Sequence, residues 1–145
     1  MKDNAKEYKG NGAAMKAVNA GEVDTALIYH YYFYGDQAKT GENSGNVGTH
    51  YFKNQDPGAF VSISGGGVLK SSKKQAQAQQ LLKFITSKAG QEVLEKGTSF
   101  EYPVASDVPA NPKLVPMADL QAPTVDPATL NGPQVVTLMT EAGLL

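Results

Sequence analysis

The sequence contains no cysteine, and only 19% of its 145 residues are charged. Without cysteine the chain can form no disulfide and offers no thiolate for metal binding or nucleophilic catalysis. The formal net charge is -1, and no block of lysine or arginine provides a surface that could neutralise phosphates. Nucleic acid is therefore not expected as a partner.

Long apolar runs are also absent. The first nine residues are polar and charged, without the apolar run of a signal peptide, and no later stretch reaches the roughly 18 apolar residues of a membrane span. As written, the sequence predicts a soluble chain, and an export signal would have to lie upstream of Met1. The hydrophobic content of 41% is sufficient for one domain with a core.

The first half of the chain alternates between helical and extended patterns. Glycines at 10 and 12 break the chain before a short helix, which Asn11 would cap with its side-chain oxygen and Gly21 would end. Residues 25–29 have the β-branched and aromatic bias of a buried parallel strand, and residues 60–63 alternate like a second strand. This order predicts an α/β fold. The glycine-rich residues 35–50 predict a mobile surface loop.

The second half predicts helices separated by an extended connection. Ser72 and Gln75 match a capping box before a helix with apolar residues on one face, and a second helix over about 89–96 stops at Gly97, making a hairpin. Seven of the eight prolines fall in residues 102–133, which favours an extended crossing segment. A last helix begins near Pro133, and the two terminal leucines are expected to dock on the body.

Four of the seven tyrosines fall within residues 29–34, at the end of the first predicted strand. Adjacent strand residues point to opposite faces, so Tyr31 and Tyr32 can converge only if the backbone leaves the strand there. A trivalent cation favours the ionised phenolate, and hard oxygen donors suit iron(III). The alternative is an aromatic corner packed into a core, with its hydroxyls hydrogen-bonded at the surface.

The run LIYHYYFY at 27–34 resembles the tyrosine-pair signature of the ferric-binding family of periplasmic solute receptors. Four further segments in the same order resemble the family, so that the likeness covers essentially the whole chain: GNGAAMKAVNAGEVD at 10–24, YFKNQDPGAF at 51–60, SGGGVLKSSKK at 64–74 and EYPVAS at 101–106. The resemblance implies an incomplete two-lobed receptor whose lobe is of the periplasmic-binding-protein type II, with a mixed sheet flanked by helices. Residues 1–61 and 109–145 would form the distal lobe. Residues 62–108 would pack on the amino-terminal lobe, which is absent.

The resemblance also implies a metal site. Tyr31 and Tyr32 would bind Fe3+ together with a synergistic anion such as carbonate or phosphate, and with His and acidic ligands from the amino-terminal half. Asn11 and Tyr29 would contact the anion, although the family often has Asn where Tyr29 stands, and Asn11 has the alternative reading of a simple helix cap. His30, in a strand, would face away from Tyr31. Two phenolates alone leave open positions on the metal, so this chain is expected to bind iron weakly or to occur metal-free.

The partners that the resemblance implies are a ferric ion and the membrane permease of a bacterial ABC importer. The full-length protein would be extracytoplasmic, in the periplasm or as a cell-surface lipoprotein. The helical hairpin would expose apolar surface, giving the isolated chain a reason to oligomerise or exchange segments. Two rival functions are a receptor that binds a small anion or polyol without metal, and an enzyme that uses a tyrosine as general acid or nucleophile, for which no partner base is identifiable.

Overall fold

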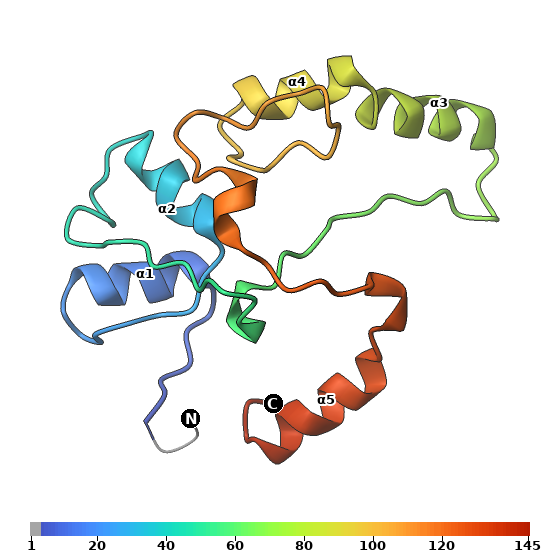
Figure 1. Cartoon of the computed structure of the whole chain (residues 1–145). Helices are drawn as coiled ribbons and strands as arrows, with labels where there is room; N and C mark the ends of the chain where they lie inside the picture. Colours follow the sequence, from blue (N-terminus) through green and yellow to red (C-terminus); the bar gives the residue numbers. More distant parts are fainter. Residues whose placement is uncertain (1–3) are drawn as a thin grey trace.

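The computed structural model describes residues 4–145 and arranges five helices along an open arc (Figure 1). Helices α1 (Asn11–Asn19) and α2 (His30–Gln37) pack together on one side of the arc. Helices α3 (Gln75–Ile85) and α4 (Lys88–Lys96) form a hairpin, and α5 (Gly132–Glu141) lies at the end of the chain. Short 3-10 turns interrupt the connections at η1 (Pro57–Ala59), η2 (Met117–Leu120) and η3 (Pro127–Thr129). The first three residues of the predicted distal lobe lie outside the described residues.

No β-strand is formed within residues 4–145, so the predicted strands at 25–29 and 60–63 are wrong for this structure and the mixed sheet is not confirmed. An apolar extended segment becomes a strand only when a neighbouring segment pairs with its backbone N–H and C=O groups. Neither segment has such a neighbour here. Their apolar side chains consequently stay open to solvent, with Leu27 75% exposed and Ile63 67% exposed.

Helix α1 ends as predicted but begins differently. The N–H groups of Gly21 and Glu22 donate to the carbonyl oxygens of Val18 and Ala17, and Gly21 adopts a left-handed φ of 73°. This is the Schellman ending that glycine favours. The expected cap at Asn11 is wrong, because the N-cap position is Gly10 and Asn11 is already the first helical residue. Its side-chain oxygen is used elsewhere, in the site described below.

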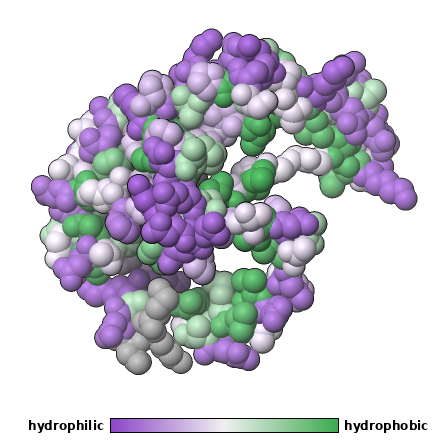
Figure 2. Space-filling view, viewed as in Figure 1, coloured by the Kyte–Doolittle hydropathy of each residue, from purple (hydrophilic) through white to green (hydrophobic). Residues whose placement is uncertain are grey.

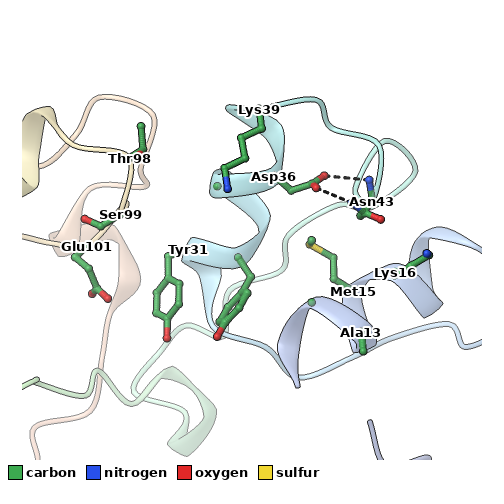
Figure 3. Close-up of a pocket in the computed structure, with 13 residues that line it drawn as sticks. Ala13, Met15, Lys16, Tyr31, Asp36, Lys39, Asn43, Thr98, Ser99 and Glu101 are labelled. Carbon is green, nitrogen blue, oxygen red and sulfur yellow. Dashed lines mark hydrogen bonds between the residues drawn. The ribbon is translucent and has the colours of Figure 1, made fainter. Parts of the chain in front are cut away.

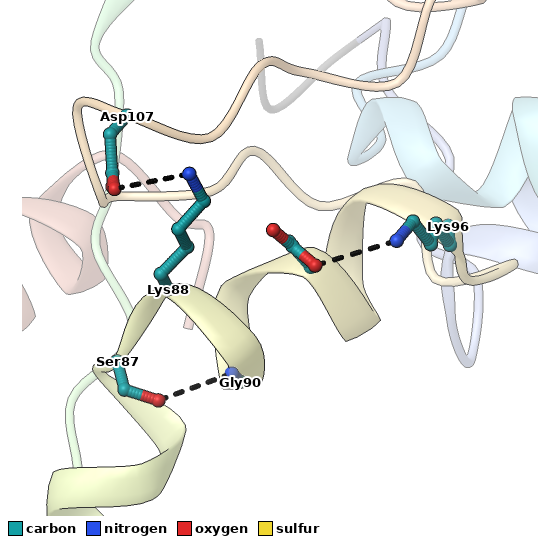
Figure 4. A network of polar contacts seen from close by, with 6 residues as sticks. Ser87, Lys88, Gly90, Lys96 and Asp107 are labelled. Atoms are coloured by element: carbon teal, nitrogen blue, oxygen red, sulfur yellow. Dashed lines mark hydrogen bonds and ion pairs between the residues drawn. The ribbon is translucent and has the colours of Figure 1, made fainter.

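The α3–α4 hairpin was predicted correctly in its helices but not in its first cap. Helix α3 starts after Lys74 without a side-chain cap, and Gln75 instead donates to the carbonyl oxygen of Lys70 at 2.7 Å. The capping-box prediction is therefore wrong. Helix α4 is capped by Ser87, whose hydroxyl accepts from the Gly90 N–H (Figure 4). A Cβ on Gly90 would collide with the carbonyl oxygen of Phe84 and lie 2.8 Å from that of Ile85, so only glycine lets the helices meet this closely.

Residues 102–131 return from the hairpin as an irregular segment with two 3-10 turns, as the proline density predicts. Three side-chain contacts tie this segment to α4, one of them from the Asn111 amide to the carbonyl oxygen of Glu95 at 3.0 Å. Lys88 forms an ion pair with Asp107 at 3.6 Å (Figure 4), and the buried Gln91 side chain accepts from the Val104 N–H at 2.7 Å. Gln91 also donates to the Ile85 carbonyl oxygen at 2.8 Å, so one amide joins α3, α4 and the returning segment.

The core is small and lies where α1, α2 and the returning segment meet. Its apolar members are Ala14, Met15, Ala17, Phe100, Val108, Leu114 and Leu120. The accessible surface of the chain is 11013 Å², whereas a compact monomer of this mass would expose about 7,200 Å². Apolar residues gather on the inner side of the arc, on the α3 region and on α5 (Figure 2).

The carboxyl terminus contributes to this exposed surface. Leu144 is 43% exposed and Leu145 68% exposed, so the expected docking of the terminal leucines is wrong. Helix α5 begins at Gly132, next to Pro133, as predicted, and it also leaves Val135, Val136 and Leu138 about half exposed. Among residues 4–145, none of the helices combines the length and apolar character that a membrane crossing requires.

Candidate metal centre

The start of α2 places the two neighbouring phenols on one side of the chain. Tyr29 is extended, with φ -73° and ψ 137°, and the helix begins at His30. The two phenols were expected to converge only if the backbone left the extended path, and here it does so between Tyr29 and His30. Successive side chains of a helix are about 100° apart rather than opposite. The rings of Tyr31 and Tyr32 accordingly lie side by side, with centroids 4.9 Å apart and planes inclined by 31°.

Both phenols line an open pocket of ≈ 680 Å³ (Figure 3). Its other walls come from the first turns of α1, the second half of α2 and residues 98–101, segments far apart in the sequence. The pocket carries charge of both signs, from Lys16, Lys39 and Glu101. In Figure 3 the carboxylate of Glu101 lies next to the ring of Tyr31. The pocket therefore offers phenol and carboxylate oxygens together.

The surroundings of Tyr31 favour its protonated form. Burial by neighbouring groups raises the pKa of the Tyr31 phenol, and the nearby Tyr32 phenol and Glu101 carboxylate raise this pKa further. At neutral pH the phenol therefore holds its proton until a cation replaces it. This arrangement suits a ligand of strong positive charge, which can displace the phenol proton.

Asn11 and Tyr29, predicted to contact an anion, are brought together by the structure. The Asn11 side-chain oxygen accepts from the Tyr29 N–H at 2.9 Å, a contact that joins the start of α1 to the start of α2. The Tyr29 ring stacks on Tyr31, with centroids 5.4 Å apart and planes 7° from parallel. In the described structure both residues lie beside the pocket without lining it. Their role toward an anion stays a prediction.

His30 does not face away from the tyrosine pair, because the residue is helical. Its ring lies edge-on to Tyr31, with centroids 5.6 Å apart, and its Nε2 is 2.8 Å from the carbonyl oxygen of Phe100. Phe100 is buried and has a left-handed φ of 54°, an uncommon conformation for a bulky residue. The histidine thus ties the tyrosine-bearing helix to residues 98–101, which form the opposite wall of the pocket.

Other tyrosines pack near the pair with their hydroxyls hydrogen-bonded. The hydroxyl of Tyr51 donates to that of Tyr34 at 3.3 Å, and the hydroxyl of Tyr102 donates to the Val115 carbonyl oxygen at 2.6 Å. Burial raises the pKa of both the Tyr51 and the Tyr102 phenol. Neither phenol lines the pocket in the described structure, so both serve as packing groups with satisfied hydroxyls.

The loop after α2 is irregular and lies largely at the surface, as its glycines predict, and Asp36 ties it to the helix. The Asp36 carboxylate accepts from the Ser44 hydroxyl at 2.5 Å and from the Asn43 N–H at 3.1 Å, and Ser44 is 1% exposed. These hydrogen bonds lower the pKa of Asp36, with that from Ser44 the largest cause. Asp36 and Asn43 also line the pocket, so the same contacts fix one of its walls.

The donor set of the pocket fits a hard cation. Within residues 4–145 no three histidine, cysteine or acidic side chains gather as a metal site, so a metal here would need phenol oxygens. Two phenols and two carboxylates line the pocket, and of the two carboxylates Asp36 is already hydrogen-bonded to Ser44 and Asn43, whereas in the described part of the chain Glu101 is not. The sequence pattern singled out the two tyrosines but not Glu101, which lies 70 positions after Tyr31 and belongs to no local motif. Only its place in the segment EYPVAS marked that region at all.

Comparison with known proteins relates the chain to iron-binding proteins. Residues 1–129 match the family model described as bacterial extracellular solute-binding protein. The chain is 63% identical over its whole length to the Fe(3+)-binding periplasmic protein of Serratia marcescens, covering 43% of that protein. It is 35% identical over 99% of its length to the major ferric iron-binding protein of Neisseria meningitidis serogroup B, covering 44% of it.

A solved structure agrees with these relatives. Iron-bound HitA from Pseudomonas aeruginosa superposes with a TM-score of 0.82 at 45% identity, over 94% of this chain and 44% of that one. The fold is therefore that of part of a periplasmic-binding-protein type receptor. The chain spans less than half the length of the relatives that it matches.

Proposed function

Since the chain belongs to the family of bacterial extracellular solute-binding proteins, we propose that it binds ferric iron through the phenol oxygens of Tyr31 and Tyr32. The observation that carries the proposal is the convergence of these two phenols, 4.9 Å apart at their ring centroids, on one pocket. Phenolate is a hard, negatively charged donor that prefers iron(III) to softer divalent ions. The relatives named above are described as ferric-iron-binding proteins, which supports the same cargo.

The bound iron would be accompanied by an anion such as carbonate or phosphate. Asn11 is the first residue of α1, where backbone N–H groups are free to face an anion, and Tyr29 stacks on the proposed ligand Tyr31. Lys16 and Lys39 line the pocket and add positive charge near the same place. These groups support an anion site at the rim of the proposed iron site.

We propose further that the complete receptor delivers iron to the permease of an ABC importer, and that it works outside the cytoplasm. A binding protein, rather than an enzyme, fits the relatives, which are described as iron-binding proteins. The name of the Serratia marcescens relative places that protein in the periplasm. Delivery and location belong to the whole receptor, of which this chain corresponds to less than half.

The proposed division of the receptor is a distal lobe from residues 1–61 and 109–145, with residues 62–108 packing on another lobe. The large exposed apolar side chains of this middle segment support the division, because such groups are normally covered. They are Ile63, Leu69, Leu81, Phe84, Ile85, Val93 and Val104. The same exposure supports self-association or segment exchange when the chain is alone.

A ferric titration tests the proposal. Iron should be added as its nitrilotriacetate complex at neutral pH while the visible phenolate-to-iron charge-transfer band is recorded. We expect the band in the wild-type chain, and its loss or strong weakening in Tyr31→Phe and Tyr32→Phe. Tyr8→Phe is the matched control, because its buried hydroxyl has no hydrogen-bond partner in the described structure.

The outcomes separate the proposal from its rivals. Absence of the band in the wild-type chain, with iron left on the chelator, would contradict ferric binding by the tyrosine pair. Heat released on adding carbonate or phosphate to the metal-free chain would then favour a receptor for small anions. Equal bands in the wild type and in both variants would show that iron binds elsewhere.

A further inference from the structure

We propose that Glu101 is a third protein ligand of the iron, supplying a carboxylate oxygen beside the phenol oxygens of Tyr31 and Tyr32. The inference rests on the proposed ferric function and adds a residue to that site. It assigns a role to a side chain that no local motif singles out. Its basis is the way the backbone places this carboxylate, its lack of any other partner, and the charge of the site that results.

The backbone before Glu101 is held in an unusual conformation. Phe100 has a φ of 54°, which costs a bulky residue free energy and persists only where the surroundings enforce it. Here the Phe100 ring is 3% exposed and packs on Tyr34 with centroids 5.7 Å apart, and its carbonyl oxygen binds His30. These contacts turn the next residue, Glu101, toward the tyrosine pair, as Figure 3 shows.

His30 links the position of Glu101 to that of the tyrosine pair. It directly precedes Tyr31, and its Nε2 reaches the Phe100 carbonyl oxygen at 2.8 Å. A single contact therefore links the residue before the phenols to the residue before the carboxylate. The contact ties together the two backbone segments that carry Glu101 and the tyrosine pair, which is the kind of support that metal ligands need.

Glu101 has no other structural task in the described residues. Within residues 4–145 its carboxylate forms neither an ion pair nor a hydrogen bond, although Lys16 and Lys39 line the same pocket. The residue is only partly exposed, so part of its hydration is lost without compensation. A carboxylate kept in this state next to two phenols is suited to a cation that arrives later.

The charge of the completed site favours iron(III). The three proposed ligands, two phenolates and one carboxylate, carry three negative charges, which balance the charge of a trivalent ion. Asp36 and the two lysines of the pocket partly cancel, with one positive charge left over. A divalent ion bound by the same three groups would leave an excess negative charge. Iron(III) bound by the two phenolates alone would leave an excess positive charge, which an external anion would have to balance. Glu101 should therefore lower the dependence of iron binding on the synergistic anion.

If Glu101 lies near the tyrosines without binding the metal, removing its carboxylate should change the iron affinity in the opposite direction. If the carboxylate only lies near the pair, its negative charge hinders ionisation of the phenols, and its removal makes phenolate formation easier. Iron binding would then stay the same or become tighter. If the carboxylate is a ligand, its removal weakens binding even though the phenols ionise more readily.

The experiment compares Glu101→Gln with Glu141→Gln, a matched loss of one negative charge at the end of α5. Ferric nitrilotriacetate and, as a redox-inert probe, gallium nitrilotriacetate are titrated at neutral pH with and without added phosphate. We expect Glu101→Gln to bind each metal at least about tenfold more weakly, the lower limit of the loss seen when a supporting residue of a metal site is removed. Added phosphate should restore more binding in this variant than in the wild type.

Circular dichroism shows whether each variant keeps its helices, and Glu101→Asp provides a second variant that keeps the charge on a shorter side chain. We expect Glu101→Asp to bind more tightly than Glu101→Gln. Wild-type-like or tighter binding by Glu101→Gln, with the charge-transfer band intact, overturns the inference and leaves the proposed function standing. No band in the wild-type chain overturns both.

Discussion

At the scale of single residues, the candidate site depends on a change of backbone conformation at one position. Tyr29 is extended and His30 is helical, so two adjacent side chains that a strand would separate lie on the same side of the chain. The Asn11 side chain fixes this change by accepting the Tyr29 N–H. In the sequence, a departure from the extended path was only the condition for the phenols to converge. Asn11 was interpreted as an anion contact or a helix cap, because its distant partner Tyr29 is invisible in a local pattern.

The raised pKa of Tyr31 predicts how iron binding varies with pH. A phenol that is protonated in the free chain must release its proton to bind metal, so affinity falls as pH falls. With two phenols releasing protons, the logarithm of the binding constant should rise by about two per pH unit between pH 6 and 8, and by about one in Tyr31→Phe. Titration against buffered chelator, corrected for the chelator's own protonation, measures both slopes. Identical slopes would mean that Tyr31 does not bind as a phenolate.

At the scale of elements, helices α1, α3, α4 and α5 were predictable, whereas α2, which carries the tyrosine pair, and the sheet were not. Helices α3, α4 and α5 carry their apolar face and their end signals within a dozen residues, so the pattern is enough to find them. The expected strand at 25–29 has the right composition but needs a pairing neighbour, and the described chain supplies none. Glu101 was missed for a similar reason, since its partners in the pocket come from α1 and α2.

Gln91 gives a test of how the elements are joined. Its amide is 3% exposed and binds both the Ile85 carbonyl oxygen and the Val104 N–H. In Gln91→Leu these two backbone groups lose their partner within the buried junction, and we expect the free energy of unfolding to fall by about 1–3 kcal/mol. Chemical denaturation followed by circular dichroism measures the change. Gln80→Leu, on the exposed surface of α3, is the control and should have little effect.

At the scale of the whole molecule, the exposed apolar surface is the dominant feature. The accessible area of 11013 Å² exceeds by about half that of a compact monomer of this mass. Much of the excess lies on α3 and α5, along the inner side of the arc. Exposure of this kind accords with the proposed packing of residues 62–108 on another lobe.

This surface predicts the behaviour of the isolated chain. We expect it to bind an apolar-sensitive fluorescent dye and to associate with itself as its concentration rises, because large exposed apolar patches drive association. Light scattering and dye fluorescence measure both effects. Replacing Leu81 and Phe84, which are 58% and 53% exposed on α3, by serine should reduce both. A strict monomer that binds no dye would show that the arc is closed in solution.

The tight approach at Gly90 affects how such association would proceed. Because no side chain fits between Gly90 and the carbonyl oxygens of Phe84 and Ile85, a larger residue at this position would force α3 and α4 to a different angle. A surface that is rigid before contact loses little conformational entropy on binding, so more of its burial energy is retained as affinity. The α3–α4 hairpin would thus bind a partner in the shape that it already has. Replacing Gly90 by a larger residue should weaken this binding even where the contacting side chains are unchanged.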